Sequence, residues 1–217
     1  MIRTIAIERE YGCGAGRISE KLASRLGWTL WDRKITAEIA GRLKCDERSV
    51  AEHEERLDTN FYRLMKIFMR GSYEVRYSGE GSGGMLDADS LSHMFEEMIS
   101  DVAGRRPSVI VGRAAPWFLR DRGDTLRLFL YAPHEEKLRR LVAQGKSESE
   151  AQAELQHVDE DRGAFVRRYY NKTWPQRDIY HLMINTEVGD EAVIEVVLHE
   201  MQLLNQSVAK HPQAATR

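Results

Sequence analysis

Short apolar runs without alternating polar residues are the feature that most limits how this chain can fold. They cover residues 4–7, 108–111, 126–131, 182–185 and, more weakly, 28–31. Runs of this kind, rich in β-branched and aromatic residues, are typical of strands in a parallel sheet that is covered on both faces. Helical patterns lie between them: Ile18, Leu22 and Leu26 recur every four residues, and Gly27 is placed to end that helix. The sequence therefore predicts an α/β fold with a doubly wound parallel sheet.

Two segments interrupt the alternation of strands and helices. Residues 32 to about 104 are predicted to form a long, mostly helical insertion, and residues 155–178 are rich in charged and aromatic side chains. Because ligands bind beyond the carboxyl ends of parallel strands, segments inserted there are expected to border a ligand site. The remainder of this single domain is predicted to be a core of about 1–31, 105–154 and 179–204, with a loose tail at about 205–217.

Composition excludes several classes of protein. The chain is 42% hydrophobic and 30% charged with a formal net charge of −2, which is typical of a globular protein and gives no reason to expect nucleic-acid binding. No apolar stretch approaches the length of a membrane span. The two cysteines, Cys13 and Cys45, have no metal-ligand spacing. Because the first predicted strand begins near residue 1, no signal peptide is expected, and a cytoplasmic location is predicted.

The stretch "YGCGAGR" (11–17) joins the first predicted strand to the first predicted helix. Glycines in such a turn let backbone N–H groups approach phosphate oxygens, and the helix N-terminus adds partial positive charge. The usual phosphate-loop pattern also has a lysine and a hydroxyl residue after its second glycine. If Gly14 is that glycine, Ala15 replaces the lysine; if it is Gly16, Arg17 replaces the lysine and Ile18 the hydroxyl residue. The loop alone leaves open both a phosphate site and a plain packing turn, and Cys13 is expected to be a small filler within it.

Charged residues near the strand ends favour phosphate binding. Arg113 comes directly after a buried strand, where the alternative is an ordinary surface arginine. Four arginines at 162–177 are interleaved with aromatic residues, which predicts a lid that closes over phosphates. The alternative is a solvated basic helix paired with its acidic neighbours. Asp32, at the end of the weak strand, either holds a substrate hydroxyl or metal-bound water, or caps the next helix.

Several stretches together resemble the cytidylate kinase-like family of P-loop proteins. They are "IAIEREYGCGAGRISEKLASRLG", "LWDRKI", "VIVGRAA", "LRLFLYAP", "VDEDRGAFVRRYYNKTW" and "YHLMINTE". The resemblance covers most of the chain and implies a P-loop NTPase-type core with a monophosphate-binding insertion at about 32–104 and a short lid at about 155–178. It implies transfer of the γ-phosphoryl group of ATP, with Mg²⁺, to a small acceptor.

The resemblance also implies roles for individual residues. The donor phosphates would be held by a six-residue loop made of Gly12, Cys13, Gly14, Ala15, Gly16 and Arg17. The acceptor would be held by Asp32 and Arg113. The catalytic cations would be Arg17, Arg162, Arg167 and Arg168. Cations dominate this set because phosphoryl transfer depends on positioning and charge stabilisation. The metal ligands stay unassigned.

The chain departs from true cytidylate kinases at three positions. In an ungapped comparison of residues 7–23, Ala15 stands at the loop lysine and Arg17 at the loop hydroxyl; later, Ala114 replaces an acidic residue that helps to hold the acceptor. We hypothesise that Arg17 partly supplies the missing lysine charge. The leading prediction is an ATP-dependent kinase of a nucleoside monophosphate or a similar small acceptor. The alternatives are a non-catalytic nucleotide-binding regulator and, least favoured, a nucleic-acid binder. Formation of a homo-oligomer through the insertion is left open.

Overall fold

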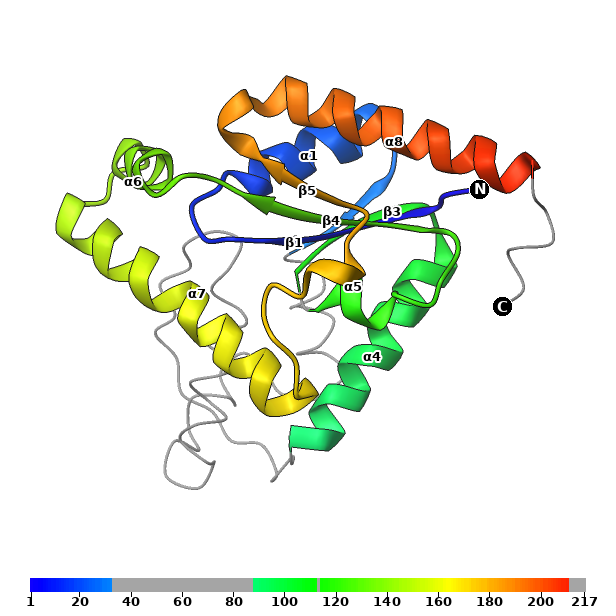
Figure 1. Ribbon diagram of the computed structural model, residues 1–217, viewed down its shortest axis with the longest axis horizontal. Helices are drawn as coiled ribbons and strands as arrows, with labels where there is room; N and C mark the ends of the chain where they lie inside the picture. The colour runs from blue at the N-terminus through cyan, green and yellow to red at the C-terminus, as the bar shows by residue number, and fades with distance from the viewer. Residues whose placement is uncertain (33–87, 113, 211–217) are drawn as a thin grey trace.

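The computed structural model describes residues 1–32, 88–112 and 114–210, which form a parallel sheet between layers of helices (Figure 1). The strands are β1 (Thr4–Arg9), β2 (Thr29–Trp31), β3 (Ser108–Val111), β4 (Thr125–Tyr131) and β5 (Leu182–Asn185). Their order across the sheet is β2-β3-β1-β4-β5, and each neighbouring pair is parallel. Each apolar run that the sequence identified is a strand, and the predicted doubly wound α/β fold is confirmed.

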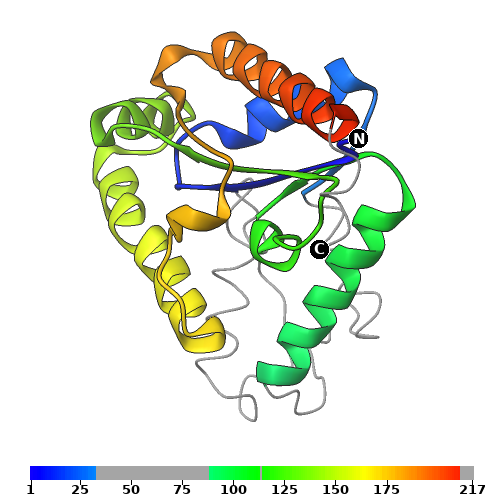
Figure 2. The same ribbon diagram turned by 45° about the vertical axis from the view of Figure 1, so that its right-hand side comes forward.

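Helices cover both faces of the sheet. The longer ones are α1 (Ala15–Leu26), α4 (Ala88–Arg105), α6 (His134–Ala143), α7 (Glu148–Tyr170) and α8 (Asp190–Lys210). The short ones are α5 (Ala115–Phe118) and the 3₁₀ turns η1 (Arg177–Ile179) and η2 (Thr186–Val188). Helices α1 and α8 lie on one face and α4 and α5 on the other, while α6 and α7 stand beyond the carboxyl ends of β1 and β4 (Figures 1 and 2).

Strand β1 contributes side chains to both helical layers. Ile5 and Ile7 are fully buried in the cluster that contains α1 and α8, whereas Ala6 belongs to the cluster that contains α4 and α5. A strand covered on both faces has no solvent side, so its sequence cannot alternate between apolar and polar residues. This packing holds the end of β1, Glu8 and Arg9, at the carboxyl edge of the sheet.

Of the predicted insertion, the structure describes residue 32 and the last part, from residue 88 on. Residues 33–87, which include Cys45, lie outside the described residues. Helix α4 spans the boundary expected near residue 104 and packs against the sheet through Met98, Ile99 and Val102. The segment expected to be a lid, 155–178, comprises the second half of α7 and the chain that leads into η1. None of the helices described combines the length and the apolar character that crossing a bilayer requires.

His181 makes the stability of the sheet sensitive to pH. Its ring Nδ1 accepts a hydrogen bond from the backbone N–H of Arg127 at 3.1 Å, and its Nε2 lies 2.9 Å from the guanidinium NH2 of the same residue. Partial burial of the ring, followed by the charge of Arg127, lowers the pKa of His181 from 6.5 to about 4. As pH falls, His181 is therefore protonated in the unfolded chain at a higher pH than in the folded protein. This difference lowers the free energy of unfolding as pH falls from about 6.5 towards 4.

We expect His181→Asn, which keeps an acceptor for the Arg127 N–H, to make folding less sensitive to acid. Urea unfolding at pH 7.5 and at pH 5.0 measures this effect, and the variant should lose less stability between the two pH values than the wild type. His199→Asn, at an exposed position on α8, serves as the control and should behave as the wild type does. Equal losses in the wild type and in His181→Asn would contradict the prediction.

Candidate active site

The glycine loop turns the chain from the end of β1 into helix α1. Gly12 and Gly14 adopt left-handed backbone conformations, with φ of +74° and +82°. A β-carbon on Gly12 would lie 3.2 Å from Lys137 Cβ, and one on Gly14 would lie 3.1 Å from Arg140 NH1. The limited space and the left-handed backbone conformation therefore both favour glycine at these positions. Gly14 is also the N-cap of α1 and offers no side-chain acceptor to the first helical N–H groups. An uncapped helix N-terminus beside a guanidinium group is suited to bind an anion.

Cys13 lies inside this loop and is fully buried. Burial raises the pKa of its thiol from 9.0 to about 11, so the sulfur stays protonated at neutral pH and is a poor nucleophile. Its place agrees with the small filler that the sequence predicted. The backbone carbonyl oxygen of Cys13 accepts hydrogen bonds from two side chains that are far away in the sequence.

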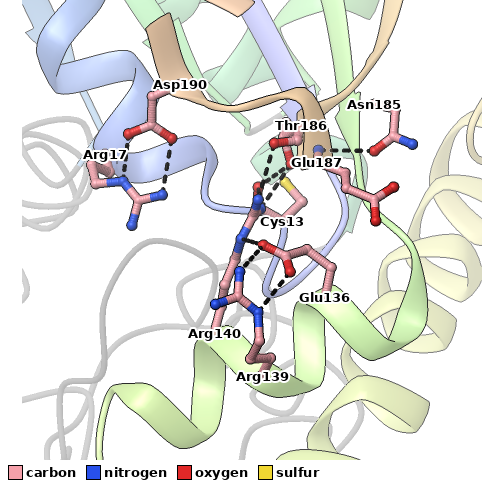
Figure 3. Close-up of polar contacts among 9 residues, drawn as sticks. All are labelled: Cys13, Arg17, Glu136, Arg139, Arg140, Asn185, Thr186, Glu187 and Asp190. Atoms are coloured by element: carbon pink, nitrogen blue, oxygen red, sulfur yellow. Dashed lines mark hydrogen bonds and ion pairs between the residues drawn. The ribbon is translucent and has the colours of Figure 1, made fainter.

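Arg140 of α6 joins the loop to the segment after β5 (Figure 3). Its NH1 donates to the carbonyl oxygen of Cys13 at 2.5 Å and to Thr186 Oγ1 at 2.8 Å, and its NH2 donates to the Thr186 carbonyl at 3.0 Å. Thr186 Oγ1 in turn donates to the Cys13 carbonyl at 2.6 Å. Glu136 orients the guanidinium from the other side by accepting from its Nε at 2.7 Å. Arg140 therefore fixes the loop and places positive charge next to Gly14.

Arg17 lies in the first turn of α1, at the edge of the same loop. Its Nε and NH2 donate to the two carboxylate oxygens of Asp190, at 2.5 and 2.9 Å (Figure 3). This bidentate contact, followed by a hydrogen bond from Lys21, lowers the pKa of Asp190, although partial burial opposes the shift. Half of the Arg17 side chain remains exposed to solvent. The residue expected to replace the lysine is thus present beside the loop, and an acidic partner shares its charge.

A second group of residues supports the loop from α7. The backbone N–H of Tyr11 donates to Asp159 Oδ1 at 2.9 Å, and Arg162 NH1 donates to the same oxygen at 2.8 Å and to the Arg9 carbonyl at 2.9 Å. Arg162 is buried, and its NH2 has no hydrogen-bond partner among the described residues. Burial raises the pKa of Asp159 despite the nearby cation. A buried, unsatisfied guanidinium nitrogen beside the glycine loop is a donor available to an anionic ligand.

The carboxyl edge of the sheet brings charged side chains close to the loop. The guanidinium of Arg9 lies directly against Gly112. A β-carbon added to Gly112 would be only 1.8 Å from Arg9 NH1. Gly112 also has a φ of +73°, a left-handed backbone conformation that favours glycine. Asp32 is buried at the end of β2. In the sequence, Arg9 is one of two arginines beside the glycine loop whose guanidinium groups favour phosphate binding.

The structure thus brings together part of the predicted residue set. The loop residues, Arg17 and Arg162 lie around one end of the sheet, as the contacts above establish. Arg167 is an exposed residue of α7. Arg168 lies on the same helix, but its side chain is not among the described ones, and Arg113 lies wholly outside the described residues. Within the described residues, no three His, Cys, Asp or Glu side chains are grouped so that they could hold a metal ion. The residues that sequence reasoning missed are Arg140, Thr186, Asp159 and Asp190.

Comparison with known proteins places this geometry in a family. The model of the cytidylate kinase-like family matches residues 4–188. Among solved structures, a protein of uncharacterised function from Eubacterium ventriosum is 20% identical with a TM-score of 0.65, over 93% of this chain and 99% of that one. This likeness concerns the fold alone.

Two enzymes of known activity have lower similarity. A shikimate kinase from Acinetobacter baumannii, solved with shikimate, is 15% identical with a TM-score of 0.49, over 95% of each chain. A deoxyadenosine kinase from M. mycoides, solved with products dCMP and dCDP, is 13% identical with a TM-score of 0.40, over 92% of this chain and 98% of that one. A comparison with proteins of curated function finds no significant match.

Proposed function

Because the chain belongs to the cytidylate kinase-like family, we propose that it transfers the γ-phosphoryl group of ATP to a small acceptor of the nucleoside monophosphate class. The observation that carries this proposal is the glycine loop, with its two left-handed glycines and uncapped helix N-terminus, held between Arg140 and Arg162. Positive charge on both sides of a loop that leads into a helix N-terminus without a side-chain cap is suited to a polyphosphate rather than to close packing alone.

Each residue has a definite task in this proposal. The N–H groups of the loop bind the donor phosphates, and Arg140 and Thr186 hold the loop in that shape. The NH2 of Arg162, which has no partner among the described residues, donates to phosphate oxygens as charge shifts during transfer. Arg17 supplies part of the charge of the absent lysine. Arg167 and Arg168 add lid cations, and Asp32 and Arg113 orient the acceptor. These assignments are our proposals from position and charge.

The residues present fit ATP better than they fit a resident metal ion. The loop and its arginines provide donors for phosphate, whereas the described carboxylates are not grouped into a metal site. We therefore retain Mg²⁺ as the ion that accompanies ATP, assign it no protein ligand and assign no catalytic step to it. When bound to nucleotide, Mg²⁺ neutralises phosphate charge.

A specific observation also favours a second candidate, a nucleotide-binding regulator without transferase activity. Ala15 stands where the family resemblance places the loop lysine, and Arg17 is engaged by Asp190. A loop of this kind can bind phosphates while giving little stabilisation to the transferring group. The retained, buried Arg162 favours the enzyme over the regulator.

ADP release over a panel of acceptors separates the two candidates. ATP with Mg²⁺ is supplied with CMP, dCMP, UMP, AMP or non-nucleotide alcohols, and nucleotide binding is measured in parallel by calorimetry. We expect one acceptor to raise ADP release at least about tenfold above the acceptor-free rate, which corresponds to a modest lowering of the barrier. Tight ATP binding with no acceptor-dependent ADP would instead identify the regulator.

A further inference from the structure

Basic residues of α1 face acidic residues at the start of α8. Arg17, Lys21 and Arg25 recur every four residues along α1, so their side chains share one side of the helix. Helix α8 lies alongside α1 (Figure 1), and each of the three cations meets a carboxylate there. Arg17 belongs to the first turn of α1 and Arg25 to the last. The contact of Arg17 therefore lies next to the glycine loop, whereas that of Arg25 lies far from it.

The contact of Arg17 with Asp190 differs in kind from that of Arg25 with Glu195. Asp190 accepts from Arg17 Nε at 2.5 Å and from NH2 at 2.9 Å, and its side chain is only 10% exposed. The Glu195 side chain is 61% exposed, and an exposed ion pair of that kind contributes little to stability. A mostly buried carboxylate that accepts from two nitrogens of a guanidinium group instead holds the group in one orientation.

That orientation places Arg17 against the loop. A β-carbon built on Gly14 would lie 3.7 Å from Arg17 NH2 and 3.1 Å from Arg140 NH1, so two guanidinium groups border this glycine. Arg140 directs its NH1 at carbonyl and hydroxyl oxygens of the protein. The NH1 of Arg17 points away from Asp190 (Figure 3). One end of the Arg17 guanidinium is thus directed away from its partner, beside a helix N-terminus that attracts anions.

Lys21 keeps the net charge of this group positive. A carboxylate that paired with Arg17 alone would cancel the attraction of the guanidinium for an anion. Lys21 Nζ lies 3.1 Å from Asp190 Oδ2, so two cations share one mostly buried carboxylate. Lys21 also lies 3.0 Å from Glu191, but that side chain is 71% exposed, and water and salt screen its charge. The group therefore presents positive charge to the loop.

We infer that Asp190 and Lys21 are positioning residues that hold Arg17 ready for the donor phosphates. That Arg17 binds those phosphates rests on the function proposed above. A half-exposed arginine without such a partner moves among many rotamers, and a ligand that must order it binds less tightly. Asp190 orders Arg17 before the ligand arrives. The ligand then meets a guanidinium group that is already in place.

Calorimetric titration with ATP and Mg²⁺ tests this role in the wild type, Arg17→Met, Asp190→Asn and the double variant. We expect Arg17→Met to weaken ATP binding about tenfold and Asp190→Asn to weaken it about fivefold. The double variant should bind ATP as Arg17→Met does, within about twofold, because Asp190 acts through Arg17. A purely structural role of Asp190 would instead add its own loss to that of Arg17→Met.

Arg25→Met and Glu195→Gln are the matched controls, because they neutralise the two partners of another ion pair between the same helices. Both side chains are half-exposed or more, and each control should bind ATP as the wild type does.

Lys21→Met carries the test if Asp190→Asn fails to fold, because Lys21 is at a half-exposed position. We expect this variant to weaken ATP binding about threefold. The same substitution made in Arg17→Met should have no further effect.

The sign of the change in affinity decides between two roles for the carboxylate. Tighter ATP binding by Asp190→Asn would show that Asp190 competes with phosphate for Arg17, and it would overturn the inference. Unchanged binding by Asp190→Asn, or additive losses in the double variant, would overturn it as well. In turnover with a competent acceptor, Asp190→Asn should raise the KM of ATP and leave the KM of the acceptor unchanged.

The positioning role and the kinase activity can fail separately. If the losses of Arg17→Met and Asp190→Asn are non-additive in ATP binding but no acceptor yields ADP, the proposed activity is wrong and the positioning role stands. If an acceptor drives ADP release and Asp190→Asn raises neither the Kd nor the KM of ATP, the activity stands and the positioning role is wrong.

Discussion

Replacing Arg140 with lysine is expected to lower the free energy of unfolding by about 2 kcal/mol and to weaken ATP binding at least about tenfold. The guanidinium makes a fork of bonds to Cys13 and Thr186 that a single ammonium group cannot reproduce. Its side chain is only 11% exposed, so the carbonyl groups left without a donor would be poorly hydrated. Urea unfolding measures the first effect, and calorimetric titration with ATP measures the second.

Arg139→Lys is the matched control, because it makes the same change one residue earlier on the same helix. The Arg139 side chain is 74% exposed and pairs with Glu136 alone among the interactions described. We expect this variant to remain within about 0.5 kcal/mol of the wild type and to bind ATP normally. If the two variants behaved alike, the contacts of Arg140 with the loop and with Thr186 would not contribute to stability or to binding.

The contrast between Arg139 and Arg140 also shows which features of the site the sequence alone could not predict. Strands, the first helix and the glycine loop were predictable because local patterns encode them: continuous apolar runs, four-residue spacing and glycines at a strand–helix junction. Nothing local separates the two arginines. Arg140 meets Cys13 across 127 residues of sequence and Thr186 across 46, so its role depends on how α6 is rotated against the loop.

The same limit applies to the acidic residues of the site. Asp159 and Asp190 contact the loop region across 148 and 173 residues, and the sequence indicated only that acidic residues lie near arginines. The sequence singled out the basic segment as a whole, whereas burial in the structure distinguishes its members. Arg162 is buried and bonded, whereas Arg167 is exposed five residues later on the same helix.

Glu8 shows how the structure changes the interpretation of a sequence difference. Ala114 stands where the family resemblance implies an acidic residue that helps to hold the acceptor. In the structure, Ala114 and Glu8 line one cavity, so a carboxylate is present there although it comes from β1 instead of from the turn after β3. The two strands are adjacent, which lets one supply what the other lacks.

The Asp159–Arg162 pair carries the second prediction of large effect. Breaking a buried ion pair from one side leaves the other charge uncompensated, so Asp159→Asn and Arg162→Met are each expected to lower the free energy of unfolding by about 3 kcal/mol. Burial raises the pKa of Asp159 even though Arg162 and the Tyr11 N–H oppose the shift. Keeping the Asp159 carboxylate ionised in the folded state therefore costs free energy. The double variant should therefore recover to within about 1 kcal/mol of the wild type.

Nucleotide binding is expected to respond differently from stability. The double variant keeps an acceptor for the Tyr11 N–H in the asparagine, so the loop retains its support. It lacks the NH2 of Arg162, which has no partner in the part of the chain that the structure describes. We expect ATP affinity to stay at least about tenfold below that of the wild type after stability has recovered. Arg167→Met, at an exposed position on the same helix, controls for stability and should cost less than about 0.5 kcal/mol. Recovery of stability and of ATP affinity together would show that Arg162 only supports the loop, whereas recovery of stability alone makes its guanidinium a phosphate ligand.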